Sequence, residues 1–260
     1  MVSQVSKTVC YEQPLNEKTR TLLRLEFLFA QLAHAVQGSS PWDTRAALQV
    51  LFDILTLTSR SELKSEIGKE LERHSLALGR LRQTPAVDTG ILETVLEELD
   101  RVRDQVRGID PLAIEALRQN DFLTPIRQRS SIPGGTCTFD LPALHHWLQS
   151  GSEACAQQIT DWLRPLAPLQ EGVQLLLRLI RDSATPCETV AVHGFFQKTL
   201  NSTAPNQLVR VILPVELKVF PEISGGKHRF SIRFMAQPTL DKRASQSTDD
   251  IDFWLACCVI

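Results

Sequence analysis

Residues 209–219 read VRVILPVELKV, and this stretch decides the fold class because its apolar side chains recur at every second position. A period of two is that of a β-strand with one buried face and one face toward solvent. Proline cannot donate a hydrogen bond to a neighbouring strand, so Pro214 favours a sheet edge or a bulge. The chain is therefore expected to contain a β portion built around this segment.

The residues after this stretch continue the same pattern. A turn is expected over 221–226, followed by a return strand that points Phe230, Ile232 and Phe234 inward. The alternate positions of that strand then form an outward basic row of Lys227, Arg229 and Arg233. The other expected strands are residues 188–196 and 250–258, with a possible added strand over residues 8–11.

Between about residues 16 and 184 the apolar residues recur at helical spacing instead. Asn16 is the expected N-cap of a first helix that is apolar on most of its circumference, which is typical of a central helix. Ser40 and Asp43 predict a capping box for the second helix. Residues 63–81 and 92–106 carry apolar stripes at spacings of three and four, and this pattern predicts an antiparallel helical hairpin.

These patterns together predict an α+β protein. It should have a mostly helical domain with a long antiparallel helical hairpin, and a smaller antiparallel β-sheet domain. The expected bounds are 15–185 for the helical domain and 186–260 for the β domain, with the possible strand at 8–11 added to the latter. A chain of 260 residues is long enough to bury a full core.

The composition excludes several classes of protein. The net charge is only -2, so any recognition of a charged partner has to come from local clusters. The six cysteines have no metal-ligand spacing. The adjacent Cys257 and Cys258 are expected to be free, half-buried thiols rather than a redox pair. His74 on the hairpin stripe is interpreted as structural. We expect a cytoplasmic protein without metal, cofactor, secretory signal or membrane insertion.

Three basic clusters are the candidate binding residues. The block RQRSSIPGG, residues 127–135, places Arg127 and Arg129 before a rigid corner, and Asp140 is the expected N-cap of the next helix. The second cluster is the row on the return strand. The third is Arg20 with Arg24, one turn apart on the first helix. Arginine suits an acidic peptide because its planar guanidinium binds a carboxylate with two hydrogen bonds.

The alternatives to a binding surface for a protein partner are a hydrolase-like enzyme and a nucleic-acid-binding protein. A hydrolase-like enzyme would use His145 or His146 with Ser130 or Ser131 and Asp140, but the sequence lacks a nucleophile elbow. A nucleic-acid-binding protein would stack bases on aromatic residues. Phe230 and Phe234 fall on the apolar side of their strand, so they are expected in the core. A non-enzymatic binding protein is therefore preferred.

Four separated motifs resemble the ZapD family, the FtsZ-associated proteins of bacterial cell division. They are PLNEK at 14–18 with RLEF at 24–27, the block from Arg127 to Leu148, ISGGK at 223–227 with RFSIRFM at 229–235, and FWLACC at 253–258. The resemblance covers nearly the whole chain in order. It implies a helical domain joined to a β domain, a homodimer and no enzymatic activity.

The resemblance also implies a partner and a site. The family binds the C-terminal tail of FtsZ and bundles FtsZ filaments at the mid-cell division ring, which promotes septum formation. Nucleic acid is not expected as a partner. The positions that match the basic residues of the family's tail-binding surface are Arg24, Arg127, Arg129, His145, Lys227, Arg229 and Arg233.

Overall fold

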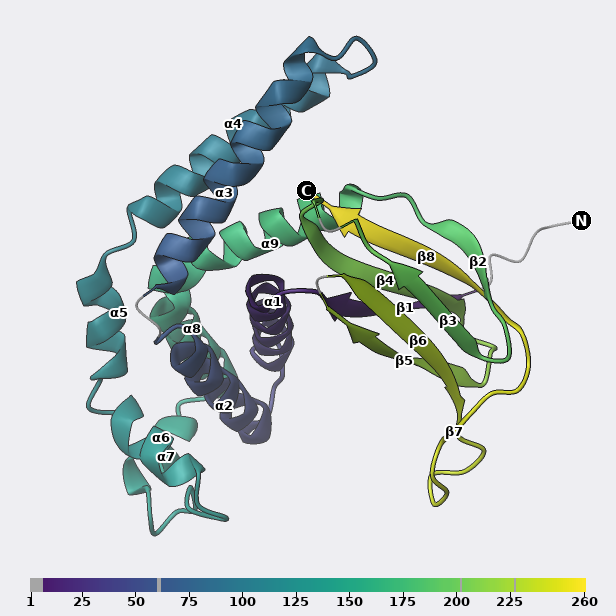
Figure 1. The fold of residues 1–260 in the computed structure, drawn as a ribbon. Helices are drawn as coiled ribbons and strands as arrows, with labels where there is room; N and C mark the ends of the chain where they lie inside the picture. Colours follow the sequence, from purple (N-terminus) through teal and green to yellow (C-terminus); the bar gives the residue numbers. More distant parts are fainter. Residues whose placement is uncertain (1–6, 60–61, 202, 227) are drawn as a thin grey trace, which may run out of the picture. The chain divides into compact units, whose positions relative to one another are not determined.

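The computed structural model describes residues 7–59, 62–201, 203–226 and 228–260 (Figure 1). The protein is α+β, as predicted, with helices followed by antiparallel sheets. Its described residues divide into two units: one extends to Thr21 and resumes over Leu177–Ile260, and the other is Leu22–Leu176. The predicted division into 15–185 and 186–260 stays a proposal about domain organisation.

The helices carry the labels α1 to α9, with two short 3₁₀ segments between them. Their bounds are α1 Glu17–Ala35, α2 Pro41–Leu57, α3 Leu63–Gly79, η1 Arg80–Gln83, α4 Thr89–Arg107, α5 Pro111–Arg118, α6 Leu123–Ser130, α7 Pro142–Leu148, α8 Ser152–Leu163, η2 Arg164–Leu166 and α9 Ala167–Asp182. Helices α1 and α2 begin at the predicted N-caps. Asn16 Oδ1 accepts from the Thr19 backbone N–H at 2.9 Å, and Ser40 and Asp43 form the predicted capping box of α2.

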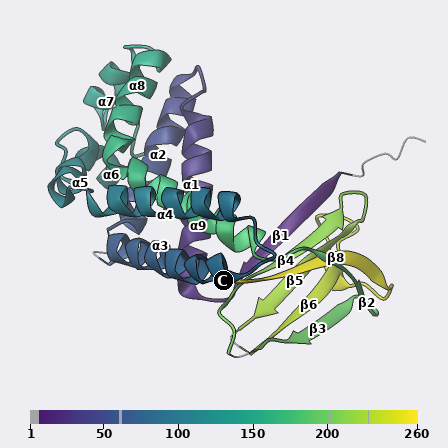
Figure 2. The same ribbon diagram turned by 90° about the horizontal axis from the view of Figure 1, so that it is seen from above.

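The predicted helical hairpin is confirmed. Figures 1 and 2 both show α3 and α4 side by side along their length. The buried seam consists of Leu63, Ile67, Leu71 and His74 on α3 and Leu92, Leu96, Leu99, Val102 and Val106 on α4. At the base of the hairpin, α9 approaches closely because Gly172 has no side chain. A Cβ there would lie 3.0 Å from Ile67 Cγ2 and 3.4 Å from Val106 Cγ2.

The prediction that α1 is buried on most of its circumference is wrong. Leu22, Leu25, Phe29 and Leu32 are buried along one stripe, but Phe27 is 67% exposed. Positions 22, 25, 29 and 32 follow helical spacing, whereas 27 points to the opposite side. The helix is therefore amphipathic with one exposed aromatic residue.

Two of the predicted strands are each divided into two. The strand expected over 209–219 ends at Pro214, and residues 215–218 form a turn in which Leu217 N–H donates to the Pro214 carbonyl. Residues 221–226 were expected as a turn, but they lie mostly in the next strand. The strand expected over 188–196 is likewise interrupted by His193 and Gly194, which both have positive φ. Local turns thus interrupt an alternating pattern that continues through them.

The strands form two antiparallel sheets. The first has the order β1-β4-β8-β2, and the second has the order β3-β6-β5 with β7 paired to β6. Their bounds are β1 Thr8–Pro14, β2 Cys187–Ala191, β3 Phe195–Thr199, β4 Asn206–Pro214, β5 Val219–Gly225, β6 Arg229–Ala236, β7 Ser245–Gln246 and β8 Ile251–Val259. The possible added strand near residues 8–11 is thus present as β1. Because β4 lies between β1 and β8, the edge position expected from Pro214 is wrong.

The two sheets enclose one apolar core. Val209, Val211 and Leu213 of β4 are fully buried, and so are Ile232 and Phe234 of β6. These residues belong to different sheets yet to one cluster, so the inner faces pack on each other. The side chains at the alternate positions of β6 consequently point away from the core.

An ion-pair network occupies the other face of the first sheet. Glu12 of β1 accepts from Arg181 of α9 through two hydrogen bonds of 2.9 and 2.8 Å, and Arg210 Nε of β4 lies 3.0 Å from Glu12 Oε1. All three side chains are largely shielded from solvent. Two guanidinium groups thus share one carboxylate, and they tie the last turns of α9 to β1 and β4.

His74 is a structural residue of the hairpin seam. Its side chain is fully buried, and Nδ1 donates to the Glu70 carbonyl oxygen at 2.8 Å. Burial lowers the pKa of the imidazole, because the charged ring would lose its hydration. The ring is therefore held neutral at neutral pH.

This shift predicts a pH-dependent stability. The pKa is lower in the folded than in the unfolded protein, so the unfolded protein binds more protons as the pH falls below about 6.5. The free energy of unfolding should decrease there until the folded pKa is passed. In His74→Leu this decrease should be smaller, as measured by circular dichroism melts from about pH 7 to pH 5. In the matched control His146→Leu, at an exposed position, the free energy of unfolding should depend on pH as in wild type. An equal pH dependence in wild type and His74→Leu would contradict the assignment.

Candidate partner-binding site

The corner between α6 and α7 depends on two glycines. Gly134 has φ +72°, a conformation that glycine adopts without strain. At Gly135 a Cβ would lie 2.5 Å from the Arg129 carbonyl oxygen, so no larger residue fits. The Pro-Gly-Gly corner therefore folds residues 131–140 back against the end of α6.

Asp140 does not cap α7, contrary to the prediction. Helix α7 follows Leu141, which has no side-chain capping bond. Asp140 instead accepts from Arg129 Nη1 at 2.8 Å and from Cys137 Sγ at 3.2 Å. Arg129 thus crosses the loop to an internal acid, and its charge is partly neutralised.

Arg127 is also engaged within the protein. Its Nη2 donates to the Arg118 carbonyl oxygen at 3.3 Å, which satisfies an acceptor at the end of α5. Arg127 is half-buried, so less of its guanidinium faces solvent than the sequence suggested. The predicted cluster of Arg127 and Arg129 is therefore partly a structural device.

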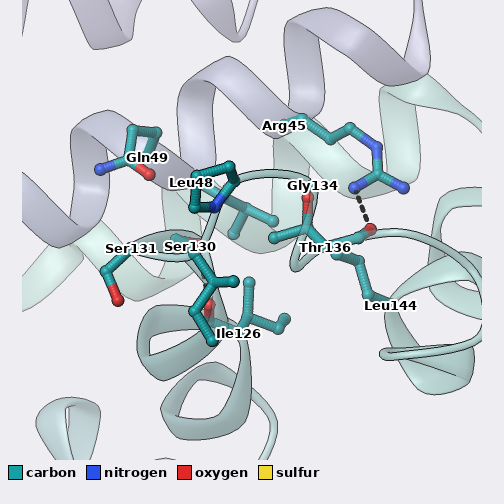
Figure 3. A pocket seen from close by; sticks show the side chains of 11 residues that line it. Arg45, Leu48, Gln49, Ile126, Ser130, Ser131, Gly134, Thr136 and Leu144 are labelled. Atoms are coloured by element: carbon teal, nitrogen blue, oxygen red, sulfur yellow. Dashed lines mark hydrogen bonds between the residues drawn. The ribbon is translucent and has the colours of Figure 1, made fainter.

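Arg45 of α2 holds the same loop from the other side. Its Nη1 donates to the Thr136 carbonyl oxygen at 2.9 Å, as Figure 3 shows. Beside this bond is a pocket of about 400 Å³. Its lining residues are Arg45, Leu48, Gln49, Ile126, Ser130, Ser131, Ile132, Pro133, Gly134, Thr136 and Leu144.

A second pocket, of about 500 Å³, adjoins the first. It shares Arg45, Gly134 and Thr136 with its neighbour and adds His145, the predicted site residue on α7. Its other lining residues are Pro41, Trp42, Cys137, Thr138, Leu148 and Gln149. Among the described residues, no aspartate or glutamate lines either pocket.

The outer face of β6 carries the second group of predicted residues. Arg229 and Arg233 are exposed, as the alternation required, and Arg233 Nη2 lies 3.4 Å from Glu222 Oε2. Within the part of the chain that the structure describes, Arg229 forms no ion pair. It lines a pocket of about 490 Å³ with Gln197, Ser224, Gly225, Gly226, His228, Phe230 and Ser231. Lys227 lies outside the described residues.

The predicted residues therefore form two sets. Arg24, Arg127, Arg129 and His145 belong to the unit Leu22–Leu176, and Arg229 and Arg233 belong to the other unit. Arg24 is exposed on α1 but lines neither of the pockets beside Arg45. Arg129 and His145 both border the loop 131–140, from α6 and α7 respectively.

The geometry does not favour the hydrolase alternative. Ser130 Oγ donates to the Ile126 carbonyl and Ser131 Oγ to the Gln128 carbonyl, so both hydroxyls are engaged by their own helix. Asp140 is engaged by Arg129 rather than by an imidazole. Across residues 7–59, 62–201, 203–226 and 228–260, no group of three or more histidine, cysteine or acidic side chains is placed to hold a metal ion.

Comparison with known proteins assigns the family. Residues 23–233 match the family ZapD, described as a cell division protein. This chain belongs to the ZapD family. It is 41% identical to the cell division protein ZapD of Methylococcus capsulatus over 97% of this chain and 98% of the relative. It is 39% identical to that of Chromobacterium violaceum and 38% identical to that of Coxiella burnetii, over 96% and 98% of this chain and 99% and 100% of those relatives.

Membership of the ZapD family gives this protein a role in cell division. Its relatives are named as cell division proteins and not as enzymes. None of the helices in the described ranges has the length and apolarity needed to cross a membrane.

Two residues of the candidate site in this ZapD-family protein were not predicted from the sequence. Neither Trp42 nor Arg45 was predicted as a binding residue, yet both line the pocket that contains His145. Trp42 could have been found from the sequence, because a tryptophan in the first turn of a helix, before its apolar stripe begins, is expected to be exposed. The role of Arg45 could not be predicted from the sequence, because it donates to a backbone carbonyl 91 residues away.

Arg45 should keep the loop 131–140 ordered. In Arg45→Met the Thr136 carbonyl loses its donor, and amide hydrogen exchange in residues 131–140 should accelerate about fivefold or more, the equivalent of one ordinary hydrogen bond. Exchange in α3 and α4 should stay unchanged. Arg80→Met, at an exposed position on η1, is the matched control. Unaltered exchange of the loop in Arg45→Met would contradict this role.

Proposed function

We propose that this ZapD-family protein binds the C-terminal tail of FtsZ, and that as a homodimer it crosslinks and bundles FtsZ filaments. The proposal places it in the cytoplasm at the mid-cell division ring, where bundling promotes septum formation. It includes no enzymatic activity, no nucleic-acid partner and no direct membrane insertion.

The observation that carries the proposal is the exposed cationic face of β6. Burial of Phe230, Ile232 and Phe234 leaves Arg229 and Arg233 on the solvent side of one strand. Arg229 lines a pocket whose other polar side chains are hydroxyls, an amide and an imidazole. Such a surface suits a carboxylate, and every C-terminal tail ends in one.

Crosslinking requires no contact between the filaments themselves. In a dimer each subunit would bind one tail, and the first attachment raises the effective concentration for the second. Individually weak contacts at exposed arginines can then hold two filaments together.

The proposal is tested first with FtsZ filaments that have or lack their C-terminal tail. The protein should sediment with intact filaments and bundle them, and it should remain in the supernatant with tail-less filaments. Binding should weaken as salt rises, because exposed charges are screened over about 8 Å at physiological ionic strength. Equal sedimentation with both kinds of filament would refute tail binding.

The double variant Arg229→Glu with Arg233→Glu should weaken tail binding about tenfold or more, because two attractive charges become repulsive. Of the two single variants, Arg229→Glu should weaken binding more than Arg233→Glu, because Glu222 already offsets the charge of Arg233. The matched control is Lys218→Glu with Lys242→Glu, which changes net charge equally at exposed positions of the same unit. If the Arg229 and Arg233 variant folds as wild type by circular dichroism and binds the tail as tightly, β6 is not the binding face.

A further inference from the structure

Trp42 is an exposed tryptophan on the surface of the helical unit. It lies in the first turn of α2 and is 77% exposed. Tryptophan carries a large apolar surface, which is usually covered either in the core or by a partner. Its ring is held in place, because the Arg45 guanidinium lies 5.8 Å from the ring centroid.

The two pockets beside Arg45 adjoin each other, and together we call them the groove. They share Arg45, Gly134 and Thr136, and Arg45 donates a hydrogen bond to the Thr136 carbonyl oxygen. Figure 3 shows Leu48, Ile126 and Leu144 around the first pocket, with Arg45 above Thr136. Apolar side chains thus line part of the first pocket, beside polar ones, while Trp42 and Leu148 are the largest apolar groups of the second.

Among the lining residues that the structure describes, Arg45 is the one with a formal charge. Arg45 uses one N–H group on Thr136, and His145 is exposed on the wall of the second pocket. Three nearby acids accept hydrogen bonds within the protein: Asp43 in the capping box of α2, Asp140 from Arg129 and Asp53 from Gln49. An anionic group entering the groove would therefore meet donors rather than other anions.

We propose that this groove binds an extended acidic peptide, which places one large apolar side chain against Trp42 and pairs a neighbouring carboxylate with Arg45 or His145. The two adjoining pockets, of about 400 and 500 Å³, can take the side chains of residues i and i+2 of an extended segment, because alternate side chains point to the same face. The identity of the peptide as the FtsZ tail rests on the proposed function. Trp42 then gives specificity for an apolar side chain of the peptide. The arginines of β6 bind carboxylates and do not select for such a side chain.

The first test measures binding of a fluorescently labelled synthetic peptide with the FtsZ tail sequence. In Trp42→Ala the Kd should rise about tenfold, as for the removal of an aromatic anchor. Trp42→Glu should weaken binding further, because it also repels the carboxylate. Phe139→Ala is the matched control and should bind as wild type, since Phe139 lies in the loop 131–140 and is 85% exposed but lines neither pocket.

A double-mutant cycle tests the contact itself. Each large apolar residue of the peptide is replaced in turn by serine, and each peptide is measured against wild type and Trp42→Ala. One replacement should weaken binding to wild type about tenfold, yet have little further effect on Trp42→Ala. Additive effects for every replacement would overturn the contact.

The outcomes separate this inference from the proposed function. If Trp42→Ala and Trp42→Glu bind the tail peptide as tightly as wild type, the groove inference fails and tail binding stands. If wild type does not bind the peptide at all, both fail. If Trp42→Ala instead lowers the mass measured by sedimentation equilibrium, Trp42 contacts a second copy of the chain, and the peptide assignment is overturned.

Discussion

Burial of the apolar side chains of β6 between the two sheets is the constraint on which the β-rich unit depends. Phe230, Ile232 and Phe234 are almost completely buried, and their removal from water is the largest stabilising contribution that this strand makes. Because side chains alternate along a strand, that burial fixes Arg229, Ser231 and Arg233 on the opposite side. The cationic face thus follows from core packing, and a one-residue slip of β6 would exchange the two faces.

In the helical unit, three of the arginines near the site are engaged by other groups of the protein. Arg45 and Arg127 donate to backbone carbonyls, and Arg129 pairs with Asp140. These contacts shape the corner between α6 and α7 and the pockets beside it. Positive charge in this unit therefore acts partly as support for a groove, whereas on β6 it faces solvent with one nearby acid.

The two surfaces proposed for partner binding differ in physical character. Contacts to Arg229 and Arg233 lie in water, so they are individually weak and screened by salt. A side chain placed against Trp42 would gain from the removal of apolar surface, which salt does not screen. Family membership sets the biological context as cell division, within which both surfaces are proposals.

Sequence alone determined the features that follow from local periodicity and local chemistry. The α+β class, the hairpin seam, the caps at Asn16 and Ser40 and the inward and outward faces of β6 each depend on residues that are close in the chain. The family resemblance was carried by short motifs of the same kind. Only the tertiary structure decided where 209–219 is interrupted, that β4 is a central strand, that Asp140 accepts from Arg129, and that Arg45 and Trp42 border His145. These features depend on partners brought together by folding, and a hydrogen bond to a backbone carbonyl 91 residues away leaves no pattern in the sequence.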